Sequence, residues 1–285
     1  MTVPIFLESH PGPVNKGLPA ILGLPLDLTS TFRSGSDSAP KAIREASDSI
    51  ESYSPFLDRD ITDYRIVDLG DLTLPVNDLA GALAAIKDRI LGVLDEGALP
   101  FSLGGEHTVT LPVVEALSQR YPDFRVLHID AHSDLRDDYD GNPVNHATVM
   151  KRIAEIIGPD RLIQLGIRSG TRDEFRWMRR HRTFYDQLPG REANLLSRLK
   201  DFPVYLSLDL DVFDPSCFPG TGNPELGGWF YDDFERFLTL LDQVNLVGAD
   251  VVELNPRLDP SGASSIAAAK VVRELLLVMA GAVEG

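Results

Sequence analysis

Three features are scarce in this chain of 285 residues, and each scarcity excludes a class of protein. Cys217 is the single cysteine, so no internal disulfide can form and nothing indicates an oxidising compartment. No segment reaches 18 uninterrupted apolar residues, so we expect no membrane-spanning helix. Basic residues are also few, with 27 Lys and Arg against 43 Asp and Glu, so nucleic acids and anionic membranes would be repelled.

The remaining composition is that of a globular protein with an acidic surface. Hydrophobic residues make up 43% of the chain, enough for the core of one large α/β domain or of two small ones. The formal net charge of −16 favours cationic partners such as metal ions or small cationic substrates, although net charge often serves solubility alone. The first residues lack the basic start and apolar run of a secretory signal, so we expect a cytoplasmic protein.

Short apolar runs alternate with stretches of helical periodicity along most of the chain. The runs are nearly continuous, as in parallel strands that are covered on both faces, and they fall at residues 20–24, 66–69, 99–103, 125–129, 162–166, 204–208 and 247–254. The helical stretches fall at residues 40–49, 79–95, 110–120, 147–157, 232–241 and 264–278. Because no linker or internal repeat divides this pattern, we expect one domain over residues 1–285, with helices on both faces of a parallel sheet.

A cluster of polar residues follows each of four predicted strands. The clusters occupy residues 104–107, 130–134, 209–211 and 253–256. In open parallel sheets, ligands bind beyond the carboxyl ends of the strands. We therefore expect the four clusters to meet at one edge of the sheet.

Six side chains in these clusters are of metal-binding type. Within residues 130–134, three of them are spaced at i, i+2 and i+4, which directs them the same way when they follow a strand. Residues 209–211 repeat the i, i+2 spacing, and residues 104–107 add a second imidazole. The candidate ligands are His107, Asp130, His132, Asp134, Asp209 and Asp211.

Each cluster alone has a simpler interpretation. A lone Asp-x-Asp after a strand is as often a turn or a helix cap, and a lone histidine is more often a satisfied polar residue. Four carboxylates in one crevice would nevertheless repel one another unless cations were present. Oxygen-rich ligation with two imidazoles and no thiolate favours manganese over structural zinc. Six ligands exceed the needs of one ion, which predicts two ions that share a carboxylate bridge and a water.

The three motifs at residues 104–107, 130–134 and 207–215 resemble the signature motifs of the ureohydrolases, the family of arginase, agmatinase, formiminoglutamase and guanidinobutyrase. The likeness extends over nearly the whole chain, through residues 31–35, 39–44, 166–170 and 250–256. It implies an arginase-like, single-domain fold, in which a mainly parallel eight-stranded sheet forms the middle of three αβα layers. It also implies a homo-oligomer, a trimer or a hexamer.

Within the family, the loop at residues 134–147 and the Gly-Ile-Arg-Ser sequence at 166–169 look most like bacterial and archaeal agmatinases. This resemblance implies hydrolysis of agmatine to putrescine and urea in polyamine biosynthesis. Arginases carry an acidic stretch at the positions of Ser169, Gly170 and Thr171, which argues against an amino-acid substrate, although Glu174 lies nearby. Aminopropylagmatine, guanidinobutyrate and arginine remain alternative substrates. Two different functions also stay open, that of a metal-dependent deacetylase and that of a catalytically silent metal-binding protein.

The resemblance also implies a role for each candidate residue. One manganese ion would be held by His107, Asp130, Asp134 and Asp209, and the other by Asp130, His132, Asp209 and Asp211, so that Asp130 and Asp209 bridge the pair.

Three residues would act on the reacting groups. Asp134 would hold the bridging hydroxide, Glu253 would pair with the guanidinium, and His146 would carry a proton to the departing amine. More simply, His146 could be a loop histidine without a role, and Glu253 could form an ion pair at the end of the sheet. Glu106 and Asn223 stand where many members carry Asp and Thr, and we expect Glu106 to orient a metal ligand.

Overall fold

The computed structural model describes residues 4–185 and 191–281 and contains one large sheet of eight strands. Every neighbouring pair in this sheet is parallel. From edge to edge the strands are β4 (Val67–Asp71), β1 (Pro19–Leu24), β5 (Leu99–Gly104), β10 (Leu246–Val252), β9 (Val204–Asp209), β6 (Arg125–Ile129), β7 (Leu162–Leu165) and β8 (Phe184–Tyr185). A small antiparallel pair, β2 (Tyr53–Ser54) and β3 (Arg59–Asp60), lies outside this sheet.

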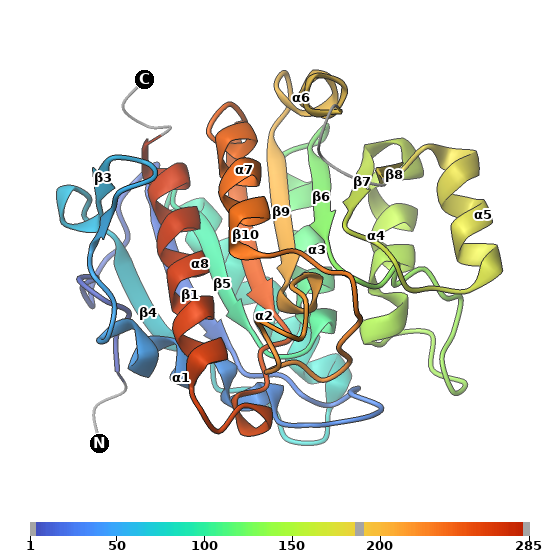
Figure 1. The fold of residues 1–285 in the computed structure, drawn as a ribbon, viewed down its shortest axis with the longest axis horizontal. Helices are drawn as coiled ribbons and strands as arrows, with labels where there is room; N and C mark the ends of the chain where they lie inside the picture. Colours follow the sequence, from blue (N-terminus) through green and yellow to red (C-terminus); the bar gives the residue numbers. More distant parts are fainter. Residues whose placement is uncertain (1–3, 186–190, 282–285) are drawn as a thin grey trace.

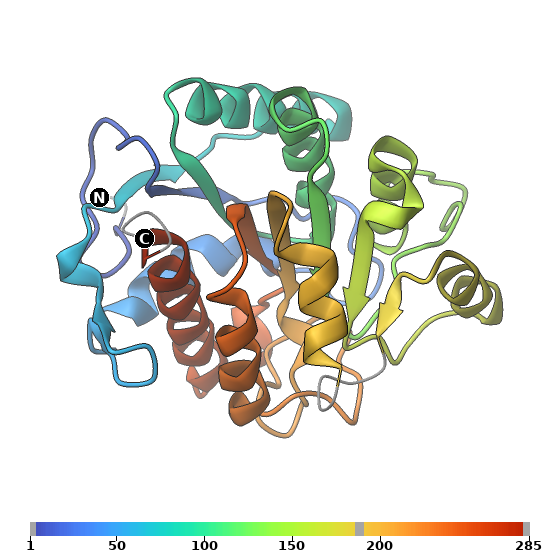
Figure 2. The ribbon, with the colours of Figure 1, turned by 90° about the horizontal axis from the view of Figure 1, so that it is seen from above.

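Helices cover both faces of the sheet, as the two views in Figures 1 and 2 show. One face carries α1 (Ala39–Ser47), α6 (Glu192–Leu199), α7 (Tyr231–Leu241) and α8 (Ala263–Gly281). The other carries α2 (Leu79–Asp95), α3 (Thr110–Arg120) and α4 (Val149–Ile157), with α5 (Arg172–His181) beside the β8 edge. The predicted three-layer arrangement around an eight-stranded parallel sheet is thus confirmed.

Most strands of the sheet supply side chains to two hydrophobic cores, because successive residues of a strand point to opposite faces. Ile21 of β1 is buried under α1 and α8, whereas its neighbour Leu22 is buried under α2 and α3. Because helices cover both faces of the sheet, most residues of a strand are apolar, and the strands appear in the sequence as apolar runs.

The register of the four central strands determines where their polar ends lie. One row of paired residues crosses β5, β10, β9 and β6, and it consists of Leu103, Val251, Leu208 and Ile129 in that order. The four polar clusters begin within a few residues of this row, so they emerge side by side at one edge of the sheet. This is the edge that the strand-end rule predicts for a ligand site.

Two α-helices and three short strands were not predicted from the sequence: α5, α6, β2, β3 and β8. Helix α5 is strongly polar, and only Glu174 and Met178 of its ten residues are buried, so the sequence contains few apolar residues there. A different signal was present, because Thr171 and Glu174 form a capping box at its start, and Thr-x-x-Glu is visible in the sequence. Among the described residues, no helix is long and apolar enough to cross a membrane.

Candidate metal centre and active site

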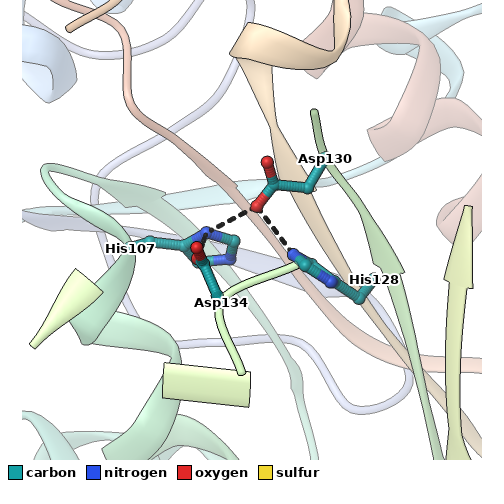
Figure 3. Close-up of side chains that lie close together, drawn as sticks. All are labelled: His107, His128, Asp130 and Asp134. Carbon is teal, nitrogen blue, oxygen red and sulfur yellow. Dashed lines mark hydrogen bonds and ion pairs between the residues drawn. The ribbon is translucent and has the colours of Figure 1, made fainter. Parts of the chain in front are cut away.

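The six candidate metal ligands converge at the carboxyl ends of β5, β6 and β9. His107 begins the 3-10 turn after β5, Asp130 directly follows β6, and Asp209 ends β9. Asp130 is fully buried, and the other two residues are at most 3% exposed. Figure 3 shows Asp130 facing both His107 and another histidine, His128.

His107 points one ring nitrogen at three carboxylates. Its Nδ1 lies 3.2 Å from Oδ2 of Asp130, 3.2 Å from Oδ2 of Asp134 and 3.3 Å from Oδ2 of Asp209. The same Nδ1 is buried and has no hydrogen-bond partner in the part of the chain that the structure describes. One imidazole nitrogen and three carboxylate oxygens therefore surround a single position.

A second group lies on the other side of Asp130. His132 Nδ1 is 2.7 Å from Oδ2 of Asp211 and 3.6 Å from Oδ1 of Asp130. Asp130 thus turns one oxygen to each group, as a bridging carboxylate would. Asp209 turns Oδ2 to the first group, whereas its Oδ1 accepts a hydrogen bond of 2.7 Å from the backbone N–H of Asp211.

The electrostatics of the cluster favour positive charge among its carboxylates. Burial raises the pKa of Asp209 well above its ordinary value, and repulsion from Asp211 and Asp130 adds to the effect. Burial and repulsion from Asp130 likewise raise the pKa of Asp211. Burial also opposes ionisation of Asp130, but contacts with the surrounding histidines outweigh it and hold its pKa well below the usual range.

These residues fit a pair of divalent cations. The unpartnered nitrogen of His107 is aimed at a group of oxygens, and Asp130 is shared by two groups of metal-binding side chains. No Lys or Arg side chain forms an ion pair with Asp130, Asp134, Asp209 or Asp211 among the described residues. Bound cations would therefore relieve the repulsion that the protein itself leaves in place.

The other ring nitrogen of His107 leads to a buried hydrogen-bond network. Its Nε2 lies 2.9 Å from Oγ of Ser207, whose hydroxyl donates to Oδ1 of Asp250 at 2.8 Å. Asp250 also accepts hydrogen bonds from Thr110 and Tyr205. A metal-binding histidine is commonly oriented in this way through its second nitrogen.

Asp134 and Glu253 reach the site from backbone conformations that side-chain-bearing residues seldom adopt. Their φ angles are +53° and +67°, in the left-handed region. Such conformations cluster at functional sites, where the surrounding structure maintains them. Oε1 of Glu253 accepts a hydrogen bond of 2.8 Å from the backbone N–H of His107, which directs the carboxylate to the metal cluster. Burial, with repulsion from Glu106, raises the pKa of Glu253 to about 8.

His146 lies at the rim of the site, at the start of the turn that leads into α4. Its Nε2 is 3.3 Å from Oγ1 of Thr31, and its ring meets that of Tyr139 edge-on. The backbone N–H of His146 donates to the hydroxyl of Thr29 at 3.1 Å. The position of this histidine therefore depends on the loop after β1, far from it in sequence.

A cavity of about 530 Å³ opens above the cluster. It is lined by candidate ligands, by all three predicted catalytic residues, and by side chains from four loops. The lining outside the candidate residues is Thr31, Phe32, Ser133, Arg136, Tyr139, Ala147, Ser169, Gly170, Thr171, Glu174 and Asn223.

Two acidic residues differ from their expected roles. Glu106 does not orient a metal ligand through its hydrogen bonds, which run to the backbone of Leu28 and Thr29 and to the hydroxyls of Thr29 and Thr108. It holds the loop that positions His146. Glu174 accepts hydrogen bonds from Ser133 and from the backbone of Leu135 and Thr171, so it fixes the loop that carries Asp134.

His128, a fully buried residue inside β6, was not predicted from the sequence to belong to the site. Its Nε2 lies 2.8 Å from Oδ2 of Asp130, and it belongs with His107, Asp130 and Asp134 to a group of side chains that could hold a metal ion. One signal was available: a polar residue interrupts an apolar strand two positions before a candidate ligand. Ser207 stands in the same relation to Asp209.

Comparison with known proteins agrees with this geometry. The family model described as the arginase family matches residues 19–278. The agmatinase of Bacillus anthracis is 39% identical over 279 residues, which cover 96% of this chain and 95% of that protein. The guanidinobutyrase of Pseudomonas aeruginosa is 32% identical over 282 residues, with coverages of 93% and 87%. The solved structure of proclavaminate amidino hydrolase from Streptomyces clavuligerus matches with a TM-score of 0.90 at 28% identity, covering 98% of each chain.

The fold and the buried His/Asp cluster define a hydrolase with a dinuclear metal site. The chain belongs to the arginase family.

Proposed function

We propose that this enzyme hydrolyses agmatine to putrescine and urea with two Mn²⁺ ions. The observation that carries the proposal is the shared Asp130, which turns its two oxygens to two separate groups of metal-binding side chains. His107, Asp134 and Asp209 would hold one ion and His132 and Asp211 the other. The likeness to agmatinases supports the choice of substrate.

Two metal ions bound here would supply a hydroxide nucleophile near neutral pH, because bound divalent cations lower the pKa of water. The protein's own residues must then present the substrate carbon to it. Asp134 lines the cavity with one oxygen 3.2 Å from the ring of His107, which supports its proposed role as acceptor of a hydrogen bond from the nucleophile.

Glu253 is the proposed anchor for the guanidinium group. A planar cation is best oriented by a carboxylate that offers two acceptor oxygens side by side. The hydrogen bond from the backbone of His107 keeps this carboxylate beside the metal cluster. A bound guanidinium cation would favour the ionised form of Glu253, whose pKa is otherwise raised.

His146 is the proposed proton carrier. Cleavage breaks the bond between the guanidinium carbon and the nitrogen that bears the alkyl chain, and this nitrogen must gain a proton to leave as putrescine. The Nδ1 of His146 is buried without a hydrogen-bond partner in the described residues, while Nε2 contacts Thr31. Histidine exchanges protons near neutrality, which suits this step.

The surroundings of the cavity favour an amine over an amino acid. Glu174, the acidic residue that kept an amino-acid substrate open, already accepts three hydrogen bonds at distances of 2.7–3.1 Å. Both of its oxygens are thus engaged in fixing neighbouring backbone and Ser133, so it is poorly placed to hold an α-ammonium group. An acidic protein also attracts a dication such as agmatine.

A guanidino acid is the second candidate substrate. Arg136 lines the same cavity, with its guanidinium 4.8 Å from the centre of the Tyr139 ring, and it could pair with a substrate carboxylate. The likeness to a guanidinobutyrase is consistent with this second candidate.

A substrate panel tests the proposal. Urea release is measured with Mn²⁺ for agmatine, aminopropylagmatine, 4-guanidinobutyrate and arginine, each with a matched sample in excess EDTA. We expect the highest kcat/KM for agmatine and no urea in EDTA. Preference for guanidinobutyrate would establish the second candidate, and absence of urea from all four substrates would refute ureohydrolase activity. We further propose that the chain is a single domain of a cytoplasmic homo-oligomer, a trimer or a hexamer; sedimentation tests the oligomeric state.

A further inference from the structure

A row of buried polar side chains crosses the sheet one step below the metal cluster. The strand register aligns five residues of β5, β10, β9, β6 and β7, and we call them the polar row: Ser102, Asp250, Ser207, His128 and Gln164. All five are fully buried, in strands that are otherwise largely apolar. Buried polar groups are costly unless they are hydrogen-bonded, so the partners of this row determine what it can do.

Gln164 has only one favourable orientation of its side-chain amide. Its Nε2 lies 2.9 Å from the backbone carbonyl oxygen of Ser133, which can only accept a hydrogen bond. Its Oε1 accepts from the hydroxyl of Thr183 at 2.9 Å. Turning the amide over would bring two acceptor oxygens together in a buried place, which is unfavourable.

The orientation of Gln164 determines where His128 carries its proton. The same Nε2 of Gln164 lies 3.2 Å from Nδ1 of His128, so Nδ1 accepts and bears no proton. The ring proton is therefore on Nε2, which donates to Oδ2 of Asp130 over 2.8 Å. An ionised carboxylate can only accept a hydrogen bond, so each contact from Gln164 through His128 to Asp130 pairs one donor with one acceptor.

We propose that His128 is a positioning residue for Asp130, and that Gln164 selects the ring tautomer that makes this possible. The hydrogen bond from His128 occupies one site on Oδ2, and the backbone N–H of His132 donates to Oδ1 at 2.5 Å. These two bonds fix the plane of the carboxylate, so that its free electron pairs face the groups around His107 and His132. The inference rests on the proposed two-metal function.

This assignment also explains why His128 is not a metal ligand, although it lies within a group of four side chains that could bind one. Its nitrogen nearest the cluster carries the proton, and its other nitrogen faces Gln164. Figure 3 shows His128 reaching Asp130 from the strand below the site.

The tautomer can be observed directly in the metal-free, full-length protein. Histidine ring nitrogens labelled with ¹⁵N show by chemical shift which of them bears a proton. The chain has six histidines, and the signals of His128 are those missing from a His128→Phe spectrum. We expect a protonated Nε2 and an unprotonated Nδ1. A proton on Nδ1 alone, or metal-induced loss of the Nε2 proton, would overturn the proposal.

Mn²⁺ binding tests the positioning role. We expect His128→Phe, which keeps a ring but no donor, to weaken Mn²⁺ binding by about 10- to 100-fold. His128→Gln places an amide N–H near the position of Nε2 and should recover most of this loss. Ser102→Ala is the matched control, because this buried member of the polar row has no hydrogen-bond partner among the described residues and should bind Mn²⁺ normally.

Equal affinity in His128→Phe and wild type would refute the positioning role, as would a His128→Gln variant no better than His128→Phe. If His128→Phe does not fold, Gln164→Met carries the test, because it leaves the donor to Asp130 but removes the control of the tautomer. We then expect Gln164→Met to bind Mn²⁺ more weakly than wild type but more tightly than a site without the His128 donor. An unchanged Mn²⁺ affinity would refute the role of Gln164.

These outcomes are separable from those of the substrate panel. An enzyme that releases no urea, yet shows the expected tautomer and the loss and rescue of Mn²⁺ binding, would contradict the proposed reaction alone. An active enzyme whose Mn²⁺ affinity does not depend on His128 would contradict this inference alone.

Discussion

Two groups of buried carboxylates in this protein are compensated in different ways. Near the β4 edge, Asp68 receives two hydrogen bonds from Arg44, of 2.7 and 2.8 Å, and the same guanidinium pairs with Asp71. At the carboxyl edge of the central strands, the described residues offer no Lys or Arg ion-pair partner to Asp209 or Asp211. The first group has a permanent cation of its own, whereas the second has only histidines as ion-pair partners within the described ranges and would bind cations from solution.

The sharpest test of this difference is Asp209→Asn. Without the carboxylate we expect urea release to fall about a thousandfold, or ~4 kcal/mol in transition-state stabilisation. The metal-free protein should be as stable as wild type or more so, because the raised pKa of Asp209 shows that its charge is disfavoured there. Its hydrogen bond from Asp211 survives, since Asn retains the acceptor oxygen. Steady-state kinetics and thermal unfolding in EDTA measure the two effects; a clear loss of metal-free stability would contradict the comparison.

Arg44→Met should show the opposite pattern. It leaves the carboxylate of Asp68 buried with backbone donors from Phe6 and Gly70 but without a cation, so we expect the free energy of unfolding to fall by about 3 kcal/mol. Mn²⁺ affinity of the folded variant should stay within about twofold of wild type, given that distant sites are usually independent. Urea denaturation and Mn²⁺ titration measure these quantities. Arg44→Lys is the control, and partial recovery of stability is expected.

Glu253→Gln refines the comparison, because we propose that this carboxylate binds the substrate rather than a metal ion. We expect kcat/KM for agmatine to fall about a hundredfold, with Mn²⁺ binding retained. A normal kcat/KM would show that Glu253 does not orient the guanidinium.

The same variant tests how the stability of the metal-free protein depends on pH. The folded-state pKa of Glu253 is about 8, above the ordinary 4.5, so the folded protein binds more protons than the unfolded chain between these values. The contribution of protonated Glu253 to the stability is therefore fully present below pH 4.5 and is lost as the pH rises to about 8. Gln cannot ionise, so the thermal midpoint of Glu253→Gln in EDTA should decline less over this range than that of wild type.

The smallest expected effect concerns a carboxylate that is compensated by N–H and O–H groups alone. Asp259 accepts hydrogen bonds from Ser261 and Ser264 at the start of α8, and those from the side chains and backbone of these serines lower its pKa to about 2. Asp259→Asn should cost about 1 kcal/mol at neutral pH, as for loss of a helix cap.

The sign of the pH dependence follows from the lowered pKa of Asp259. Its stabilising contribution is present above pH 3.8 and is lost as the pH falls to about 2, so wild type and Asp259→Asn should converge in acid. Urea denaturation at several pH values measures this difference; a gap that stayed constant down to pH 2 would contradict the assigned cause.

Much of the fold was predictable because its strands are buried on both faces. Seven of the eight strands of the sheet and six helices appear in the sequence as apolar runs and helical periodicity, with ends that shift by a few residues. Strand β8 has only two residues and α5 contains few apolar residues, so neither was recognised in the sequence. Burial of side chains, rather than intrinsic preference, thus decided which elements could be recognised.

The sequence by itself determined the residues from which a metal site could be built, since alternating ligands after a strand point to one side whatever lies around them. Only the tertiary structure decided how those residues are held. Gln164 reaches His128 because β7 pairs with β6, and Glu106 holds the loop beside His146 because β5 pairs with β1. Strand order and register bring together residues far apart in the chain, and no local pattern of amino acids encodes which strand will be the neighbour of another.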